Sequence, residues 1–223
     1  LRKQNLQSTD IDFFLAGDLL NQLISANFAA GSLGIPFLGI FGACSTMAEG
    51  LILASMLVDG GYASRVISAA SSHYCTAERQ YRFPVEQGVQ RPMSAQWTVT
   101  GAGAFLVSGQ GEGIRVTHAT VGKAIDAGIK NTSDMGAAMA PAAVDTIITH
   151  LKDTGRNPND YDLIITGDLA SVGRNIAVDL GNQQGYDLSG LNDCGILIFD
   201  HRAQDTHAGG SGCACSAVVT AGH

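Results

Sequence analysis

The sequence predicts a layered α/β fold, an αβαβα sandwich built from two similar halves. Short apolar runs alternate with longer segments that carry apolar residues every three or four positions. One segment near the start of the chain recurs 150 residues later, and a short cysteine motif occurs once in each half. Strands that alternate with helices favour a largely parallel sheet with helices on both faces, and the duplication predicts two such layers.

Seven short apolar runs with turn residues on their flanks are typical of buried strands. They cover residues 13–16, 37–41, 66–70, 104–108, 114–118, 163–166 and 195–199. Segments between them have helical spacing, and two of them end at glycine, a residue common just past a helix C-terminus. The predicted helices cover residues 19–33, 46–59, 139–154 and 175–182, and the apolar stretch at the chain's end resembles the start of another.

The repeat divides the chain into halves. The segment DIDFFLAGDL at residues 10–19 matches DYDLIITGDL at residues 160–169, and Ala-Cys-Ser occurs at both 43–45 and 214–216. Such self-similarity indicates a duplicated α/β unit. We predict one half at residues 1–112 and the other at 113–223, with the strands near Phe13 and Leu163 in equivalent positions.

Composition excludes several classes of protein. The chain has 223 residues, 45% of them hydrophobic and 15% charged, which favours a folded core over disorder. Its formal net charge of −7 gives no attraction to nucleic acid or to an anionic membrane, and no apolar run is as long as a membrane span. The five cysteines fit neither a zinc spacing nor a disulfide framework, so we expect reduced thiols and neither a metal nor a cofactor. Because the first residue is not methionine and the last ones resemble a helix start, we expect further chain at both ends.

Cys44 is the leading candidate for a site residue. It stands between a predicted strand and a predicted helix, with Ser45 beside it. The free backbone N–H groups at a helix start favour an anion, so such a position activates a thiol or holds a carboxylate. The alternative is a buried thiol that only packs, because free cysteine is among the most buried residue types.

A second candidate region follows the strand predicted at residues 66–70. Open α/β sheets bind ligands at the C-terminal ends of their strands, and SSHYCTAER at residues 71–79 lies there. His73 is favoured because it is nearest to the strand end and an imidazole can donate to a carboxylate. Arg79, Arg82 and Arg91 are further candidates in the run. The alternative for each is a solvated surface loop with local ion pairs.

Other polar residues have a structural interpretation. Asp18 and Asp168 occupy equivalent places in the repeat, each after a glycine at a strand end, and we expect both to cap the following helix. His118, His150 and His201 have no companions at a metal-ligand spacing, so we interpret them as structural or solvent-facing.

These features together resemble a known superfamily. A cysteine at a strand-to-helix junction, a TGAGAF strand entry at residues 100–105 and a duplicated α/β half are similar to the thiolase and ketoacyl-synthase superfamily. Within it, the chain resembles the stage V sporulation protein AD family of spore-forming bacteria over essentially its whole length. The strings that carry this resemblance are GACSTMAEG from residue 42, SSHYCTAERQYRFP from residue 71, DMGAAMAPAAVDTI from residue 134 and GGSGCACSAVVT from residue 209.

The resemblance implies a protein that binds dipicolinic acid (pyridine-2,6-dicarboxylate), often with calcium, for its uptake into the developing spore. It implies partners among the other membrane proteins of the stage V sporulation A operon, and through them a peripheral place at the inner membrane of the spore or forespore. It further implies a homodimer through the strand at residues 66–70 and no nucleic acid.

The same resemblance suggests how the ligand is held. We expect a pocket at the start of the helix that follows Cys44 and Ser45. Helix N–H groups, His73 and one or more of the three arginines would meet the two carboxylates.

The resemblance fails at the residues that complete a condensing enzyme. Such enzymes pair the cysteine with a His and with a second His or Asn from the other half. The corresponding loops read ITGDLAS at residues 165–171 and GSGCACS at 210–216, without His or Asn. A thioester on Cys44 would lack a charge-stabilising partner, so we expect no catalysis. Two alternatives remain: a condensing enzyme or acyltransferase that uses Cys44, and a structural subunit whose pocket is a vestige.

Overall fold

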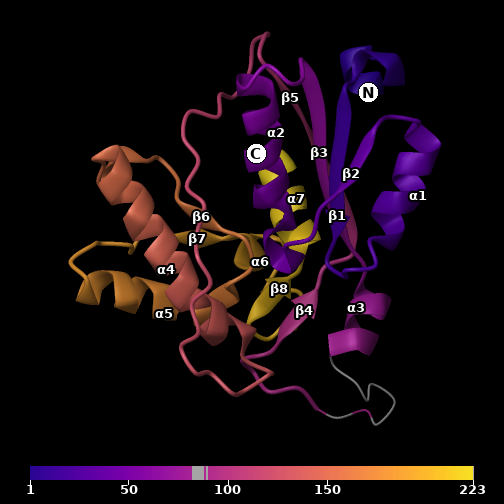
Figure 1. The fold of residues 1–223 in the computed structure, drawn as a ribbon. Helices are drawn as coiled ribbons and strands as arrows, with labels where there is room; N and C mark the ends of the chain where they lie inside the picture. Colours follow the sequence, from indigo (N-terminus) through magenta and orange to yellow (C-terminus); the bar gives the residue numbers. More distant parts are fainter. Residues whose placement is uncertain (82–87, 89, 223) are drawn as a thin grey trace. The chain divides into compact units, whose positions relative to one another are not determined.

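The computed structural model describes residues 1–81, 88 and 90–222, and the chain divides into two compact units. Unit 1 comprises the ranges 1–83, 99–117 and 212–223, and unit 2 comprises 84–98 and 118–211. Each unit is therefore assembled from segments that are distant in the sequence (Figure 1). The boundary expected at residues 112 and 113 concerns the repeat rather than these units, and it stays a prediction.

A four-stranded sheet with the order β2-β1-β3-β5 forms the centre of unit 1. Its strands are β1 (Phe13–Asp18), β2 (Phe37–Gly39), β3 (Arg65–Ser72) and β5 (Gly101–Ser108). The first three are parallel, and β5 is antiparallel to β3. All four lie in apolar runs that predict strands, and the largely parallel arrangement is confirmed.

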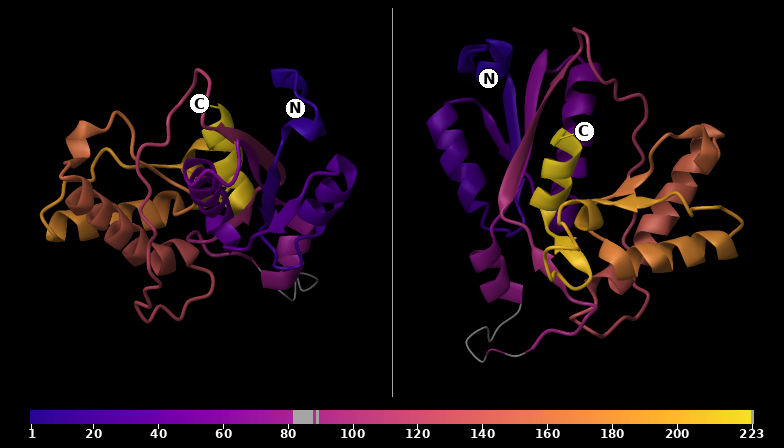
Figure 2. Two further views of the ribbon diagram at one scale, coloured as in Figure 1. Left: turned by 45° about the horizontal axis from the view of Figure 1, so that its top comes forward. Right: turned by 180° about the vertical axis from the view of Figure 1, so that it is seen from behind.

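Helices cover both faces of this sheet. They are α1 (Ile24–Leu33), α2 (Thr46–Asp59) and α7 (Cys213–Gly222). Successive residues of β1 point to opposite faces, so Phe14 packs with α1 and Leu15 packs with α2. Figure 1 shows α1 on one side of the strands and α2 and α7 on the other, and Figure 2 shows α7, in yellow, alongside the sheet. The predicted layered α/β fold is thus confirmed.

The sequence repeat has a counterpart in the backbone. Two short 3-10 helices, η2 (Ser8–Asp10) and η5 (Pro158–Asp160), lie 150 residues apart, and each has a capping box. The N–H of Gln7 donates to Asp10 and the N–H of Asn157 donates to Asp160, each at 2.7 Å. A strand follows in each case, β1 after η2 and β6 (Ile165–Thr166) after η5. The matched segments therefore share their local conformation as well as their sequence.

Unit 2 is built around a close contact between two helices, α4 (Met135–Thr154) and α5 (Ala170–Gln183). A Cβ on Gly136 would lie 2.8 Å from the backbone nitrogen of Gly173, so glycine is required for this approach. The core beside the contact contains Ala140, Val144, Ile148, Leu169, Ala177, Leu188 and Leu191. Two small parallel sheets complete the unit, β4 (Gln96–Thr98) with β8 (Gly209–Ser211), and β6 with β7 (Asn192–Asp193).

Two predicted strands are wrong in kind, and one helix was not predicted. Residues 114–118 are irregular, and Ile114 is 98% exposed, because no described strand pairs with them. Residues 195–199 fall on α6 (Cys194–Leu197) because Asp193 caps that helix by accepting the N–H of Gly195 at 2.8 Å. The polar run after β3 contains the helix α3 (Tyr74–Tyr81) rather than a loop only.

The helices predicted at residues 19–33, 139–154 and 175–182 begin at other residues than expected. The bounds of α2 agree with the prediction, and the helix expected at the end of the chain is confirmed as α7. The helix expected from residue 19 begins at Ile24, because Leu23 before it has a left-handed backbone with φ of 53°. Asp134 caps α4 by accepting the N–H of Ala137 at 3.1 Å, so this helix starts earlier than its apolar periodicity indicates.

The dimer expected through residues 66–70 cannot use that strand. β3 lies inside the sheet, where β1 and β5 already pair with its two sides. Among the described strands of unit 1, the two edges are β2 and β5. Within the described residues, no helix is both long and apolar enough to cross a bilayer.

Buried aspartates hold the helix starts. Asp18 accepts the N–H of Ala26 in the first turn of α1 at 3.3 Å, which confirms its capping role. At α5 the N–H groups of Leu169 and Ala170 bind Asp193, at 2.9 and 2.7 Å. Asp193 also accepts from the Thr166 hydroxyl, and the sequence alone did not indicate it. The capping expected of Asp168 stays a prediction.

We expect Asp193→Ala to lower the free energy of unfolding by about 3 kcal/mol, because buried backbone donors would lose their acceptor. Asp193→Asn, which keeps the size and one acceptor oxygen, should lose less. Urea unfolding measures both. The control is Asp187→Ala, which removes an exposed aspartate that accepts the N–H of Ser189. Equal losses in Asp193→Ala and the control would contradict this role.

Candidate functional site

Three parallel strands of unit 1 end at the same edge of the sheet. β2 leads into the turn that holds Cys44 and Ser45, β1 ends at Asp18, and β3 ends directly before His73. This C-terminal edge is where open α/β sheets bind ligands. The structure therefore brings three of the predicted site residues, Cys44, Ser45 and His73, to one edge.

Cys44 lies in a tight turn, the 3-10 helix η3 (Ala43–Ser45), directly before α2. Ala43 has φ of 48°, a left-handed conformation that is uncommon for residues other than glycine. The carbonyl of Gly42 accepts the N–H of Ser45 at 3.0 Å and its hydroxyl at 2.8 Å, and the Thr46 hydroxyl donates to the carbonyl of Ala43 at 2.8 Å. The turn is held by its own hydrogen bonds, which fix Cys44 at the helix start.

The Cys44 side chain is half-buried against an apolar cluster. The buried members are Leu19, Met47, Ala70, Ala77, Cys213 and Ala217, and Leu20, Ala43, Leu51 and Phe105 pack around them. Cys44 therefore contributes to packing, as the structural alternative expects. Its partial exposure also leaves it accessible to a ligand.

Tyr81 and Cys213 approach the same place from α3 and α7. The Tyr81 hydroxyl donates to the carbonyl of Leu19 at 3.2 Å, and the Cys213 thiol donates to the carbonyl of Ser71 at 2.9 Å. Burial raises the pKa of Tyr81, and negative charge on Cys44 and Cys213 raises it further. Neither residue was indicated as a site residue by the sequence, although Cys213 is next to the recurring Ala-Cys-Ser motif.

A carboxyl group also lies at the start of α2. The Oε2 atom of Glu49 is buried and has no hydrogen-bond partner among the described residues. A Cβ on Gly42 would lie 2.7 Å from this oxygen, which places the carboxyl against the turn that holds Cys44. Burial raises the pKa of Glu49. Its place in the first turn of a helix that follows the candidate cysteine was the signal that could have identified it.

The other predicted residues are distributed over both units. His73 is exposed and begins α3, since its carbonyl accepts the N–H of Ala77 at 3.1 Å, and Arg79 is exposed on the same helix. Arg82 lies outside the described residues. Arg91 belongs to unit 2, where its guanidinium carbon stacks 4.1 Å from the ring centroid of Trp97. The candidate residues of this run therefore divide between the two units.

Gln96 joins two segments at residues 165–171 and 210–216. Its side chain is 1% exposed, and its amide nitrogen donates to the carbonyl of Asp168 at 2.6 Å and to that of Gly210 at 3.2 Å. The amide oxygen is buried without a hydrogen-bond partner among the described residues. Gln96 thus fixes the backbone of both segments within unit 2. The sequence did not indicate this role, because Gln96 is a single polar residue in a short strand.

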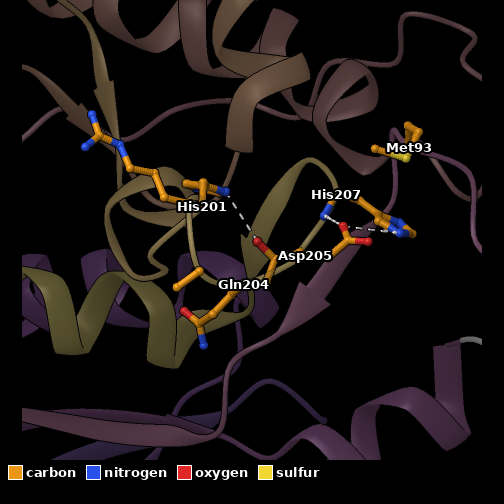
Figure 3. Close-up of a pocket in the computed structure, with 8 residues that line it drawn as sticks. Met93, His201, Gln204, Asp205 and His207 are labelled. Carbon is orange, nitrogen blue, oxygen red and sulfur yellow. Dashed lines mark hydrogen bonds and ion pairs between the residues drawn. The ribbon is translucent and has the colours of Figure 1, made fainter.

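Unit 2 has an open cavity of about 410 Å³, lined by Met93 and residues 201–207 (Figure 3). The ring of His201 contacts the carbonyl of Ile196 at 2.9 Å, and that of His207 contacts the carbonyl of Pro92 at 3.1 Å and Asp205 at 3.7 Å. Both histidines hold the loop itself, which confirms the structural interpretation of His201.

His150 is likewise structural, because its two ring nitrogens contact the hydroxyls of Thr120 and Tyr161, each at 2.8 Å. The ring of His118 packs edge-on against it, with centroids 6.4 Å apart. The histidines of unit 2 that are described here have structural contacts. We therefore keep the strand edge of unit 1 as the candidate site.

Comparison with known sequences gives one family. The family model described as stage V sporulation protein AD matches residues 1–223. The stage V sporulation protein AD of Bacillus subtilis (strain 168) is 55% identical over 224 residues, which cover 100% of this chain and 66% of that protein. The chain thus spans slightly less than two thirds of the length of this relative.

Solved structures of condensing enzymes have a similar fold. The 3-oxoacyl-[acyl-carrier-protein] synthase III of Aquifex aeolicus VF5 has a TM-score of 0.62 at 16% identity, over 99% of this chain and 70% of that one. OleA H285N of Xanthomonas campestris with cerulenin has a TM-score of 0.68 at 11% identity, over 100% and 67%. The tetronic acid condensing enzyme AbyA1 has a TM-score of 0.64 at 14% identity, over 98% and 71%. At these identities the similarity shows the fold alone.

We expect Tyr81 to ionise at higher pH than an exposed tyrosine, because burial and nearby negative charge disfavour the phenolate. The difference between the ultraviolet pH titrations of the parent and Tyr81→Phe isolates this residue among the five tyrosines. Cys44→Ser should lower the pKa of Tyr81, because serine does not ionise. Cys75→Ser, a change at an exposed cysteine of α3, is the control. An unchanged Tyr81 titration in Cys44→Ser would contradict the electrostatic contact.

Proposed function

Because the chain belongs to the stage V sporulation protein AD family, we propose that its role in sporulation is to bind dipicolinic acid without converting it. The observation that carries the proposal is the convergence of Cys44, Ser45 and His73 at the C-terminal edge of three parallel strands. The ligand is the one that the family resemblance implies. Uptake into the forespore would then occur with membrane proteins of the same operon as partners, at the inner membrane.

The chemistry of this edge suits a small planar dicarboxylate. The start of α2 offers backbone N–H groups and the positive end of a helix dipole to one carboxylate. His73, directly after β3, and Arg79, on the helix α3 that follows, would offer an imidazole and a guanidinium to the other, and both residues are exposed. A calcium ion on the ligand would reduce the negative charge that the site must accept.

Binding without catalysis is supported by the two segments that resemble the catalytic loops of a condensing enzyme. Their sequences, at residues 165–171 and 210–216, contain no His or Asn. Two of their carbonyls are engaged by the buried amide of Gln96. The proposal therefore assigns Cys44 a place in the wall of a binding site rather than the role of a nucleophile.

A condensing enzyme or acyltransferase is the second candidate, and one observation favours it. The left-handed conformation of Ala43 presents Cys44 on a strained turn at a helix start, and strained residues concentrate at active sites. Incubation with acyl-coenzyme A donors and measurement of the intact mass decides between the two. An acyl adduct on Cys44 that turns over to a condensed product, without affinity for dipicolinic acid, would establish the enzyme.

We expect the full-length protein to bind dipicolinic acid in titration calorimetry, with and without calcium. Cys44→Ala should weaken binding by about 1 to 2 kcal/mol through altered packing at the pocket floor. His73→Ala and Arg79→Ala should each cost about 2 kcal/mol or more, because a ligand carboxylate would lose its partner.

The control for the charge change is Arg65→Ala, since Arg65 is exposed at the other end of β3. Equal affinities for Arg79→Ala and Arg65→Ala would remove Arg79 from the site. A parent protein that does not bind the ligand at all would refute the proposed function and favour the structural subunit.

We also propose a homodimer, formed through the edge strand β2. Leu38 of this strand is 47% exposed although it is apolar, and an edge strand can pair with its own copy across a twofold axis. Leu38→Lys should therefore shift the protein towards the monomer in light scattering at micromolar concentration. Leu106→Lys, on the opposite edge strand β5, is the matched control. A monomeric parent would refute the dimer, and a monomer in Leu106→Lys alone would assign it to β5.

A further inference from the structure

We infer that Glu49 must carry a proton when a carboxylate ligand occupies the start of α2, so that ligand binding is coupled to proton uptake at this side chain. The inference rests on the proposed function, because it concerns the same site. It adds a regulatory property, the dependence of affinity on pH, and assigns that property to one residue.

A carboxylate ligand bound at the start of α2 would lie beside the carboxyl group of Glu49. Glu49 is in the first turn of α2, and its buried oxygen faces Gly42, within the turn that carries Cys44. The hydroxyl of Ser45 faces the same point of Gly42. An anion bound at this helix start would therefore have the Glu49 carboxyl as a neighbour, and two like charges at short range disfavour each other.

The titratable side chains around this point do not compensate a second negative charge. Cys44 is on the same turn, Tyr81 approaches from α3, Cys213 from α7, and Asp18 ends β1. Each of these four groups is neutral or negative, and none becomes a cation. The cations assigned to the site, His73 and Arg79, lie at and after the end of β3 and are matched to the other carboxylate of the ligand. Burial already raises the pKa of Glu49, so its carboxyl takes up a proton more readily than that of an exposed glutamate.

The sign of the effect follows from linkage. The protonated form of Glu49 accepts the ligand better, so the bound state has a higher Glu49 pKa than the free state. Affinity is constant below the free-state pKa, falls by up to about tenfold per pH unit above it, and levels off above the pKa of the complex. A neutral glutamine of the same size should remove this dependence and bind more tightly at the high-pH end.

The test is titration calorimetry of the full-length protein with dipicolinic acid between about pH 5.5 and 8.5, above the usual range of carboxyl pKa values. Repetition in buffers with different ionisation enthalpies gives the number of protons taken up. The variants are Glu49→Gln and, as an exposed carboxyl control, Glu112→Gln. We expect weaker binding with rising pH and proton uptake in the parent and in Glu112→Gln. Both effects should be clearly smaller in Glu49→Gln, where the His73 imidazole assigned to the ligand remains.

Thermal unfolding provides a second measurement, independent of the ligand. A raised Glu49 pKa stabilises the fold below the unfolded-state pKa, and this contribution is lost as the pH rises through the folded-state pKa. The stability of Glu49→Gln relative to the parent should therefore increase with pH, and this measurement also shows that the variant folds.

Two outcomes would overturn the inference, and they are distinguishable. If the parent binds the ligand and Glu49→Gln retains the same pH dependence and proton uptake, Glu49 is not the coupled group and the proposed function stands. If neither protein binds the ligand at any pH, the proposed function fails and the inference fails with it.

Discussion

The parallel pairing of β1 with β2 on one side and β3 on the other is the constraint on which the rest of unit 1 depends. Phe14 is opposite both Phe37 and Ile67, and this register fixes which residues of β1 face α1 and which face α2. A shift by one residue would exchange the two faces and expose the core. The same pairing makes three strands end together, so the place of Cys44 and His73 follows from backbone hydrogen bonds.

Much of the fold could be predicted from local sequence, because β1, β3, β5 and α2 have clear periodicity and turn residues at their ends. The predictions that failed did so for local reasons that hydrophobic periodicity does not reveal. The cap at Asp193 makes a helix of an apolar run, and α3 is a polar helix with few buried side chains. Cys44 and His73 were chosen as candidates because each lies within a few residues of a strand end, and the structure places both at the same edge of the sheet. The roles of Glu49, Tyr81 and Gln96 depend on distances between segments, which a single sequence does not give.

The acidic side chains at the starts of α5 and α2 differ in their hydrogen bonds. At the start of α5, the carboxylate of Asp193 meets backbone N–H groups and a hydroxyl, so the fold supplies its own anion. At the start of α2, the buried oxygen of Glu49 meets no donor among the described residues. The first arrangement fixes a junction between elements. The second leaves one buried carboxyl oxygen at the start of α2 without a hydrogen bond from the described residues, so the fold alone explains only the first arrangement.

The position of α7 has a consequence for how the protein is made. Cys213 and Ala217 pack against Ala70, so one face of the first sheet is completed by a helix synthesised some 140 residues later. Until that helix leaves the ribosome, α2 is the only described helix of this face that can cover β3 and β5, and contacts at such large sequence separation form slowly. Nascent chains should therefore expose this face and be substrates for holding chaperones, and the early part of the chain cannot reach its native packing during its own translation.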